Sequence, residues 1–184
     1  APEKVLAARS GWAEAEPDVA VRLMRAVWRA GRWLGQPVNR SVASEVLAAP
    51  GRLTVLPELI ERALGGRLVI SPEGEERASP HLIEFFAGAA TFPWRSQAAW
   101  IGVQLARRHG LDPVAAAGAA RAVFRSDLYR LHLRSAGADL PGASEKVEGS
   151  LSAPSPVASE RGNLILAADR FFDARIFDPD DPLR

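Results

Sequence analysis

Prolines at the starts of helix-forming segments constrain the fold of this chain more than any other sequence feature. Pro17, Pro57, Pro93 and Pro113 each lie at or near the first turn of a segment whose apolar residues have helical spacing. Proline is tolerated there because the first N–H groups of a helix have no intrahelical partner. The sequence therefore predicts a helix-rich chain built from several short segments.

The expected helices cover residues 17–34, 40–48, 57–64, 94–109, 112–124 and 126–133. Asn39, Asp112 and Ser126 are the side chains that we expect to cap three of them. Together with the strands predicted below, these segments indicate a helix-rich α/β fold.

Extended structure is predicted in fewer places. The stretch RLVIS (67–71) is β-branched and bounded by Gly and Pro, which favours a strand, and Leu164–Leu166 is a second candidate. Lys4–Arg9 is either a short strand or an extended entry. Residues 72–80 are predicted to be a polar loop, and 82–90 a short helix or a buried turn.

The segment 17–34 carries a stripe of apolar residues, with arginines on the other side. Val19, Leu23, Val27 and Trp28 are members of the stripe. Such a basic amphipathic pattern also occurs in helices that bind membranes or calmodulin. We favour a surface helix that docks on the protein through the stripe.

The composition changes after Gly137. Residues 137–163 are rich in Gly, Ser, Pro and Ala, which indicates a long excursion without regular structure. We therefore expect a helix-rich lobe portion over residues 1–136, and an extended segment with a C-terminal tail over 137–184 that packs on it.

Composition excludes several classes of function. The 23 Lys and Arg residues nearly balance the 22 Asp and Glu residues, so charge gives no indication of nucleic-acid binding. There is no cysteine, which excludes disulfides and thiolate sites. No apolar run is long enough to span a bilayer. His81, His109 and His132 lack the spacing of metal ligands.

Other possible catalytic groupings have simpler explanations. Asp178, Asp180 and Asp181 form either a cation site or a solvated acidic tail, and we favour the tail. Ser126, Asp127 and His132 resemble a hydrolase grouping only superficially, because the strand-to-helix turn that exposes a nucleophile is missing. No phosphate-binding loop is present. We therefore expect no enzymatic activity and no cofactor.

The stretch TFPWRSQAAW (91–100) holds two of the five tryptophans. Six residues along a helix correspond to about 600°, so Trp94 and Trp100 are not expected to form a single aromatic wall. We interpret the stretch as the start of a docked helix. The role of Arg95 is not apparent from the sequence.

Several motifs nevertheless resemble one family. The segments at 2–40, 85–100 (FFAGAATFPWRSQAAW) and 124–130 (FRSDLYR) resemble the nitrate- and bicarbonate-type substrate-binding proteins of ABC transporters. That family includes cytoplasmic nitrate/nitrite sensors. LPGASEKVEGSL (140–151) and DRFFDARIFDPDDP (169–182) are similar to its closing segments. Thr91 stands where many members carry Asn.

The resemblance implies the C-terminal portion of a two-lobed, type II periplasmic-binding-protein-like fold of roughly twice this length. The start at APEKV, without methionine, fits the expectation of a piece of a longer chain. In such folds the ligand lies between the lobes, and most anion ligands of the family come from the first half. The resemblance implies one ligand here, Lys4, or Glu3 if the alignment is shifted by one residue.

Three functions follow from these expectations. The first is capture of nitrate or a similar small oxyanion for an ABC importer, in the periplasm, with the transporter membrane subunits as partners. The second is a cytoplasmic nitrate/nitrite sensor that binds a regulatory antitermination protein. The third is a helical interaction module without a small-molecule ligand.

Overall fold

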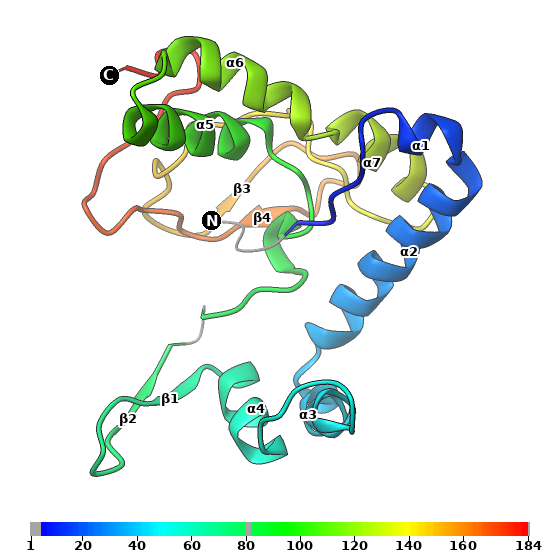
Figure 1. Cartoon of the computed structure of the whole chain (residues 1–184), viewed down its shortest axis with the longest axis vertical. Helices are drawn as coiled ribbons and strands as arrows, with labels where there is room; N and C mark the ends of the chain where they lie inside the picture. Colours follow the sequence, from blue (N-terminus) through cyan, green and yellow to red (C-terminus); the bar gives the residue numbers. More distant parts are fainter. Residues whose placement is uncertain (1–4, 80–81, 184) are drawn as a thin grey trace. The chain divides into compact units, whose positions relative to one another are not determined.

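The computed structural model describes residues 5–79 and 82–183. Its helices are α1 (Trp12–Ala15), α2 (Pro17–Leu34), η1 (Pro37–Asn39), α3 (Arg40–Ala48), α4 (Pro57–Leu64), η2 (Ala87–Ala89), α5 (Arg95–His109), α6 (Pro113–Val123) and α7 (Ser126–Leu133). The short strands β1 (Arg67–Val69) and β2 (Glu76–Ala78) pair antiparallel, as do β3 (Ser155–Pro156) and β4 (Ile165–Leu166). This arrangement confirms the helix-rich α/β class, and Figure 1 traces it along the chain.

Contacts between Cα atoms divide the chain into two compact units. Unit 1 comprises Ala1–Arg25 and Gly88–Arg184, and unit 2 comprises Ala26–Ala87. Helix α2 contributes residues to both. Residues 137–183 group with α5, α6 and α7 in unit 1.

The core of unit 1 lies where α5 and α6 pack side by side (Figure 1). Ala99 and Val103 of α5, Ala117 of α6 and Phe177 of the C-terminal segment form one buried cluster. Small residues let the two helices approach closely: a Cβ atom on Gly102 would lie 2.7 Å from the carbonyl oxygen of Ala116. The segment around Phe177 is therefore part of the core of unit 1.

Local sequence signals explain where these helices begin and end. Pro113 opens α6, and the carboxylate of Asp112 accepts a hydrogen bond from the N–H of Val114 at 2.9 Å, as a capping side chain should. Gly110 ends α5 with a φ of 67°, in the left-handed region that favours glycine. Asp112 is thus confirmed as a cap.

Residues 137–163 have little regular structure, as predicted, but they are not a loose excursion. Leu140 is completely buried, and Ala138 and Glu148 are nearly so. Backbone bridges join Pro141 to Ser159 and Glu148 to Phe177. Because these residues fill the interior of unit 1, the segment contributes to its core despite its Gly- and Ser-rich composition.

Unit 2 is built from the second part of α2, α3, α4 and the β1–β2 pair. Helices α3 and α4 pack on each other, and α4 also contacts β1. Trp28 is buried, and its ring contacts that of Phe86 edge-on with centroids 5.4 Å apart. Residues 72–80 were predicted to be a polar loop, but they contain β2. The side chains of Glu76 and Arg77 are exposed, and their backbones pair with β1.

The apolar stripe predicted for α2 is confirmed at Trp28, and it is wrong by about one residue in phase at its aliphatic members. Val19, Leu23 and Val27 are between 39% and 44% exposed, whereas Ala20 and Trp28 are at most 4% exposed. A rotation of 100° per residue separates these two faces. The error arose because the largest aliphatic side chains were assigned to the core, and a small alanine occupies the buried position instead.

Two predicted caps are also wrong. The Asn39 side chain makes no capping bond to α3; its Nδ2 donates to the carbonyl oxygen of Trp33 at 2.8 Å, because the short helix η1 precedes α3. Ser126 is the first residue of α7 and is buried, so it lies one position inside the helix.

Within residues 5–79 and 82–183, no helix is both long enough and apolar enough to cross a bilayer.

Candidate functional site

The predicted anion ligand Lys4, and Glu3 beside it, lie outside the described residues, so their role stays a prediction. The chain has one other lysine, Lys146. Its Nζ is paired with the carboxylates of Glu148 and Asp169 and lies 5.9 Å from the centroid of the Trp94 ring. Because two carboxylates neutralise Lys146, it is not available to an anionic ligand.

Ser96, the last residue of the stretch TFPWRS (91–96), connects the start of α5 to the segment around Lys146 and Glu148. The Ser96 hydroxyl donates to Oε1 of Glu148 at 2.6 Å and accepts the N–H of Lys146 at 3.2 Å. Ser96 is completely buried and Glu148 is 5% exposed. This buried network holds the loop in place, since each polar group in it has a partner.

The aromatic residues of the stretch pack in the same unit. Phe92 contacts Trp94 and Tyr129 edge-on, with ring centroids 4.9 and 5.3 Å away. The hydroxyls of Thr91 and Tyr129 are hydrogen-bonded at 2.7 Å. Trp100 is separate and stacks on Phe171. The two tryptophans therefore do not share a wall, as the helical spacing predicted.

Arg95, whose role the sequence did not reveal, connects three segments. Its backbone N–H donates to the carbonyl oxygen of Ser144 at 2.9 Å, and its Nε donates to that of Arg121 at 3.2 Å. Glu145 lies between Arg95 and Arg121, 3.7 and 3.6 Å from their Nε atoms. These contacts make Arg95 a structural residue of unit 1.

Among the described residues, no hydrogen bond joins the side chains of Ser126, Asp127 and His132. The Asp127 carboxylate is paired with Arg125, which also binds Glu14 at 2.6 Å. Hydrogen bonds from Arg125 lower the pKa of Asp127 and that of Glu14. In the part of the chain that the structure describes, no group of three or more His, Asp and Glu side chains could hold a metal ion.

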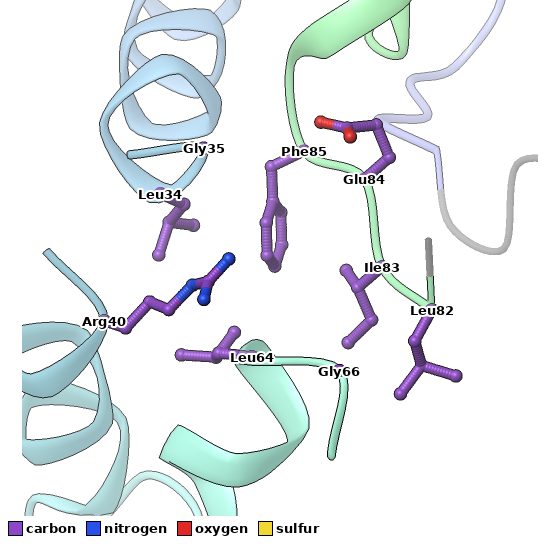
Figure 2. Close-up of a pocket in the computed structure, with 9 residues that line it drawn as sticks. All are labelled: Leu34, Gly35, Arg40, Leu64, Gly66, Leu82, Ile83, Glu84 and Phe85. Atoms are coloured by element: carbon purple, nitrogen blue, oxygen red, sulfur yellow. The ribbon is translucent and has the colours of Figure 1, made fainter. Parts of the chain in front are cut away.

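A small pocket in unit 2 is a candidate for a ligand site. Its volume is about 60 Å³. The residues that line it are Leu34, Gly35, Arg40, Leu64, Gly66, Leu82, Ile83, Glu84 and Phe85. Figure 2 shows the Arg40 side chain extending between Leu34 and Leu64 toward the ring of Phe85. From the sequence, Arg40 is predicted only as the first residue of a helix.

A second, wider hollow lies in unit 1. Its volume is about 590 Å³, and the stacked rings of Trp100 and Phe171 form part of its wall. Arg107, Arg175 and the fully exposed ring of Phe172 also line it.

The chain is similar to several known proteins. The model of the NMT1-like family matches residues 1–48. The nitrate/nitrite binding protein NrtA of Synechococcus elongatus is 27% identical over 98% of this chain, and that of a Nostoc species is 25% identical over 98%. The chain spans 37% and 38% of these two relatives, little more than a third of their length.

Two further comparisons extend this result. The nitrate import ATP-binding protein NrtC of Synechococcus elongatus is 28% identical over the whole chain, which covers 24% of that relative. The crystal structure of the periplasmic nitrate-binding protein NrtA from Synechocystis PCC 6803 superposes with a TM-score of 0.74 at 20% identity, over 95% of this chain and 41% of that one. At this identity the superposition shows the fold. The chain therefore has the fold of the C-terminal part of a type II periplasmic-binding-protein-like molecule, and it resembles the nitrate-type substrate-binding proteins, as its motifs indicated.

Proposed function

We propose that this chain is part of a solute-binding protein that captures nitrate or a similar small oxyanion for an ABC importer. The observation that carries this proposal is the similarity to two nitrate/nitrite binding proteins over 98% of the chain. The similarity to a nitrate import ATP-binding protein supports the transport context. The periplasm is the proposed location.

In this proposal the chain supplies one lobe and the residues that precede it in the longer protein supply the other. The anion binds between the lobes, and binding selects the closed arrangement. Most of the anion ligands belong to the other lobe, and Lys4 contributes a positive charge from this one. An ammonium group balances a small monoanion without the fixed geometry of a guanidinium fork.

The division of labour between the lobes is tested by calorimetry. The chain by itself is expected to show no micromolar binding of nitrate, because most ligands are missing. Micromolar binding by the chain alone would refute this division.

The role of Lys4 is tested in the longer protein. Lys4→Ala is expected to weaken nitrate binding, because it removes the charge that balances the anion. Arg9→Ala is the control, since it removes an equal charge from an exposed residue nearby. Unchanged affinity in Lys4→Ala would exclude Lys4 from the anion site.

The sensor function makes a different prediction. A sensor binds a regulatory protein with an affinity that nitrate changes, and by linkage the regulator changes the affinity for nitrate by the same factor. Nitrate-dependent binding to a regulatory protein, in place of transporter membrane subunits, would favour the sensor over the importer component.

A further inference from the structure

Arg40 differs from the other partly buried arginines of the chain. Within residues 5–79 and 82–183, each of the others has a carbonyl or carboxylate partner: Arg25, Arg62, Arg95, Arg121 and Arg130. Arg40 is partly buried as well, and the described residues provide no hydrogen-bond acceptor or ion-pair partner for its guanidinium. Its side chain extends into the pocket of unit 2 (Figure 2).

A partly buried guanidinium without a counter-charge is energetically unfavourable. Burial away from water penalises a charged group that lacks a partner. Leu34 and Leu64 flank the side chain (Figure 2). An anion in the pocket would supply the missing counter-charge.

The geometry of the pocket limits the class of anion. A volume of about 60 Å³ suits an ion of a few heavy atoms, since a cavity needs roughly 10–15 Å³ of such volume to hold one water. The planar guanidinium presents parallel N–H groups that match two oxygens of a planar oxyanion. Nitrate, bicarbonate and small carboxylates share this chemistry.

Glu84 is the carboxylate among the residues that line the pocket, and it does not neutralise Arg40. Its Oε1 accepts hydrogen bonds from the N–H groups of Phe86 at 3.1 Å and Ala87 at 2.8 Å. These bonds hold the carboxylate at the turn before η2, and no ion pair joins it to Arg40. The positive charge in the pocket is thus left for an external anion.

We propose that Arg40 and its pocket form a binding site for a small planar oxyanion within unit 2. The site does not involve Lys4, so it does not depend on the proposed function of the longer protein. With one charged group and an opening to solvent, we expect a dissociation constant on the order of 1 mM.

The test is an NMR titration of the full chain, labelled with ¹⁵N, with sodium nitrate and separately with sodium formate. Chloride keeps the ionic strength constant. The Nε–H signal of Arg40 and the backbone amides of Gly35 and Gly66, which line the pocket, report on binding. We expect these signals to shift along a saturable curve. Shifts that rise linearly without saturation would overturn the proposal.

Substitutions separate the site from general charge effects. Arg40→Met is expected to abolish the saturable shifts of Gly35 and Gly66, and Arg40→Lys to weaken binding about fivefold or more because the fork is lost. Arg62→Gln is the matched control: it removes the same charge from the same unit, at an arginine already paired with Glu76. Equal binding by Arg40→Lys and the unchanged chain, or equal loss in Arg62→Gln, would refute the site.

Two further variants distinguish alternative explanations. Lys4→Ala is expected to leave the titration unchanged, and loss of binding there would assign the anion to the other site. Glu84→Gln is expected to leave the Arg40 Nε–H signal in place when no anion is present. A large shift of that signal would mean that Glu84 pairs with Arg40 in solution, and it would overturn the proposal.

Discussion

The hydroxyl of Ser96, in the first turn of α5, donates a hydrogen bond of 2.6 Å to the carboxylate of Glu148, which lies 52 residues later in the chain. Both side chains are buried. Lys146 completes the arrangement through ion pairs with Glu148 and Asp169. This network attaches an irregular segment to a helix, so the stability of unit 1 depends on polar contacts as well as on its apolar cluster.

The first prediction concerns this buried carboxylate. Glu148→Ala is expected to lower the free energy of unfolding by about 2–3 kcal/mol, because it removes the acceptor of the buried Ser96 hydroxyl and one of the two carboxylates paired with Lys146. Urea unfolding measures the change. Glu160→Ala is the control, since Glu160 is more exposed and pairs with Arg134 at the surface; a loss of less than about 0.5 kcal/mol is expected there. Equal losses in the two variants would contradict a special role for Glu148.

The positions of the helices could be predicted from local signals, and this network could not. Pro57, Pro113 and Asp112 act on residues within one turn, so their effects are visible in the sequence. The partners Ser96 and Glu148 are far apart in the chain, and Glu148 follows a stretch rich in Gly and Ser. Burial of that stretch results from tertiary packing, which composition does not reveal.

The second prediction concerns the contact between α5 and α6. A Cβ on Gly102 would lie 2.7 Å from the carbonyl oxygen of Ala116 and 2.8 Å from Cβ of Ala120. Gly102→Ala is therefore expected to reduce the free energy of unfolding by about 1–3 kcal/mol, since the helices must move apart.

Gly118 provides the matched control on α6. A Cβ there would meet no atom within 4 Å, so Gly118→Ala is expected to raise the free energy of unfolding by about 0.5–1 kcal/mol through its helix propensity. Both values come from denaturant unfolding. Stabilisation by both substitutions would show that the close approach at Gly102 is not essential.

The candidate pocket illustrates a second limit of sequence analysis. Arg40 was placed correctly at the start of a helix, and Gly35 and Gly66 lie just beyond the helices predicted over 17–34 and 57–64. Nothing in their spacing indicates that these ends meet around residues 82–85. The absence of an acidic partner for Arg40 is a property of three-dimensional packing, so only the structure could identify the pocket.

The third prediction concerns pH. Arg125 lowers the pKa of Asp127 below its usual value, so the ionised carboxylate is favoured in the folded state. This contribution is present above the unfolded pKa of about 3.9 and is lost as the pH falls through the lower folded pKa. Because the pair is exposed, Asp127→Asn is expected to cost about 0.5 kcal/mol or less at pH 7.

Urea unfolding of Asp127→Asn and the unchanged chain at pH 7 and at about pH 3 checks this expectation. The difference between the two free energies should shrink as the pH falls, because the carboxylate that Arg125 binds becomes protonated. A difference that grows toward low pH would contradict the ion pair.

The fourth prediction concerns the start of α6. The Asp112 carboxylate accepts the N–H of Val114 at 2.9 Å, and Asp112 carries its charge at the positive end of the helix dipole. Asp112→Ala is expected to lower the free energy of unfolding by about 1 kcal/mol, while Asp112→Asn keeps the accepting oxygen and loses only the smaller charge effect. Thermal and urea unfolding of both variants provide the comparison. If Asp112→Asn were as destabilising as Asp112→Ala, the charge rather than the capping bond would stabilise the start of α6.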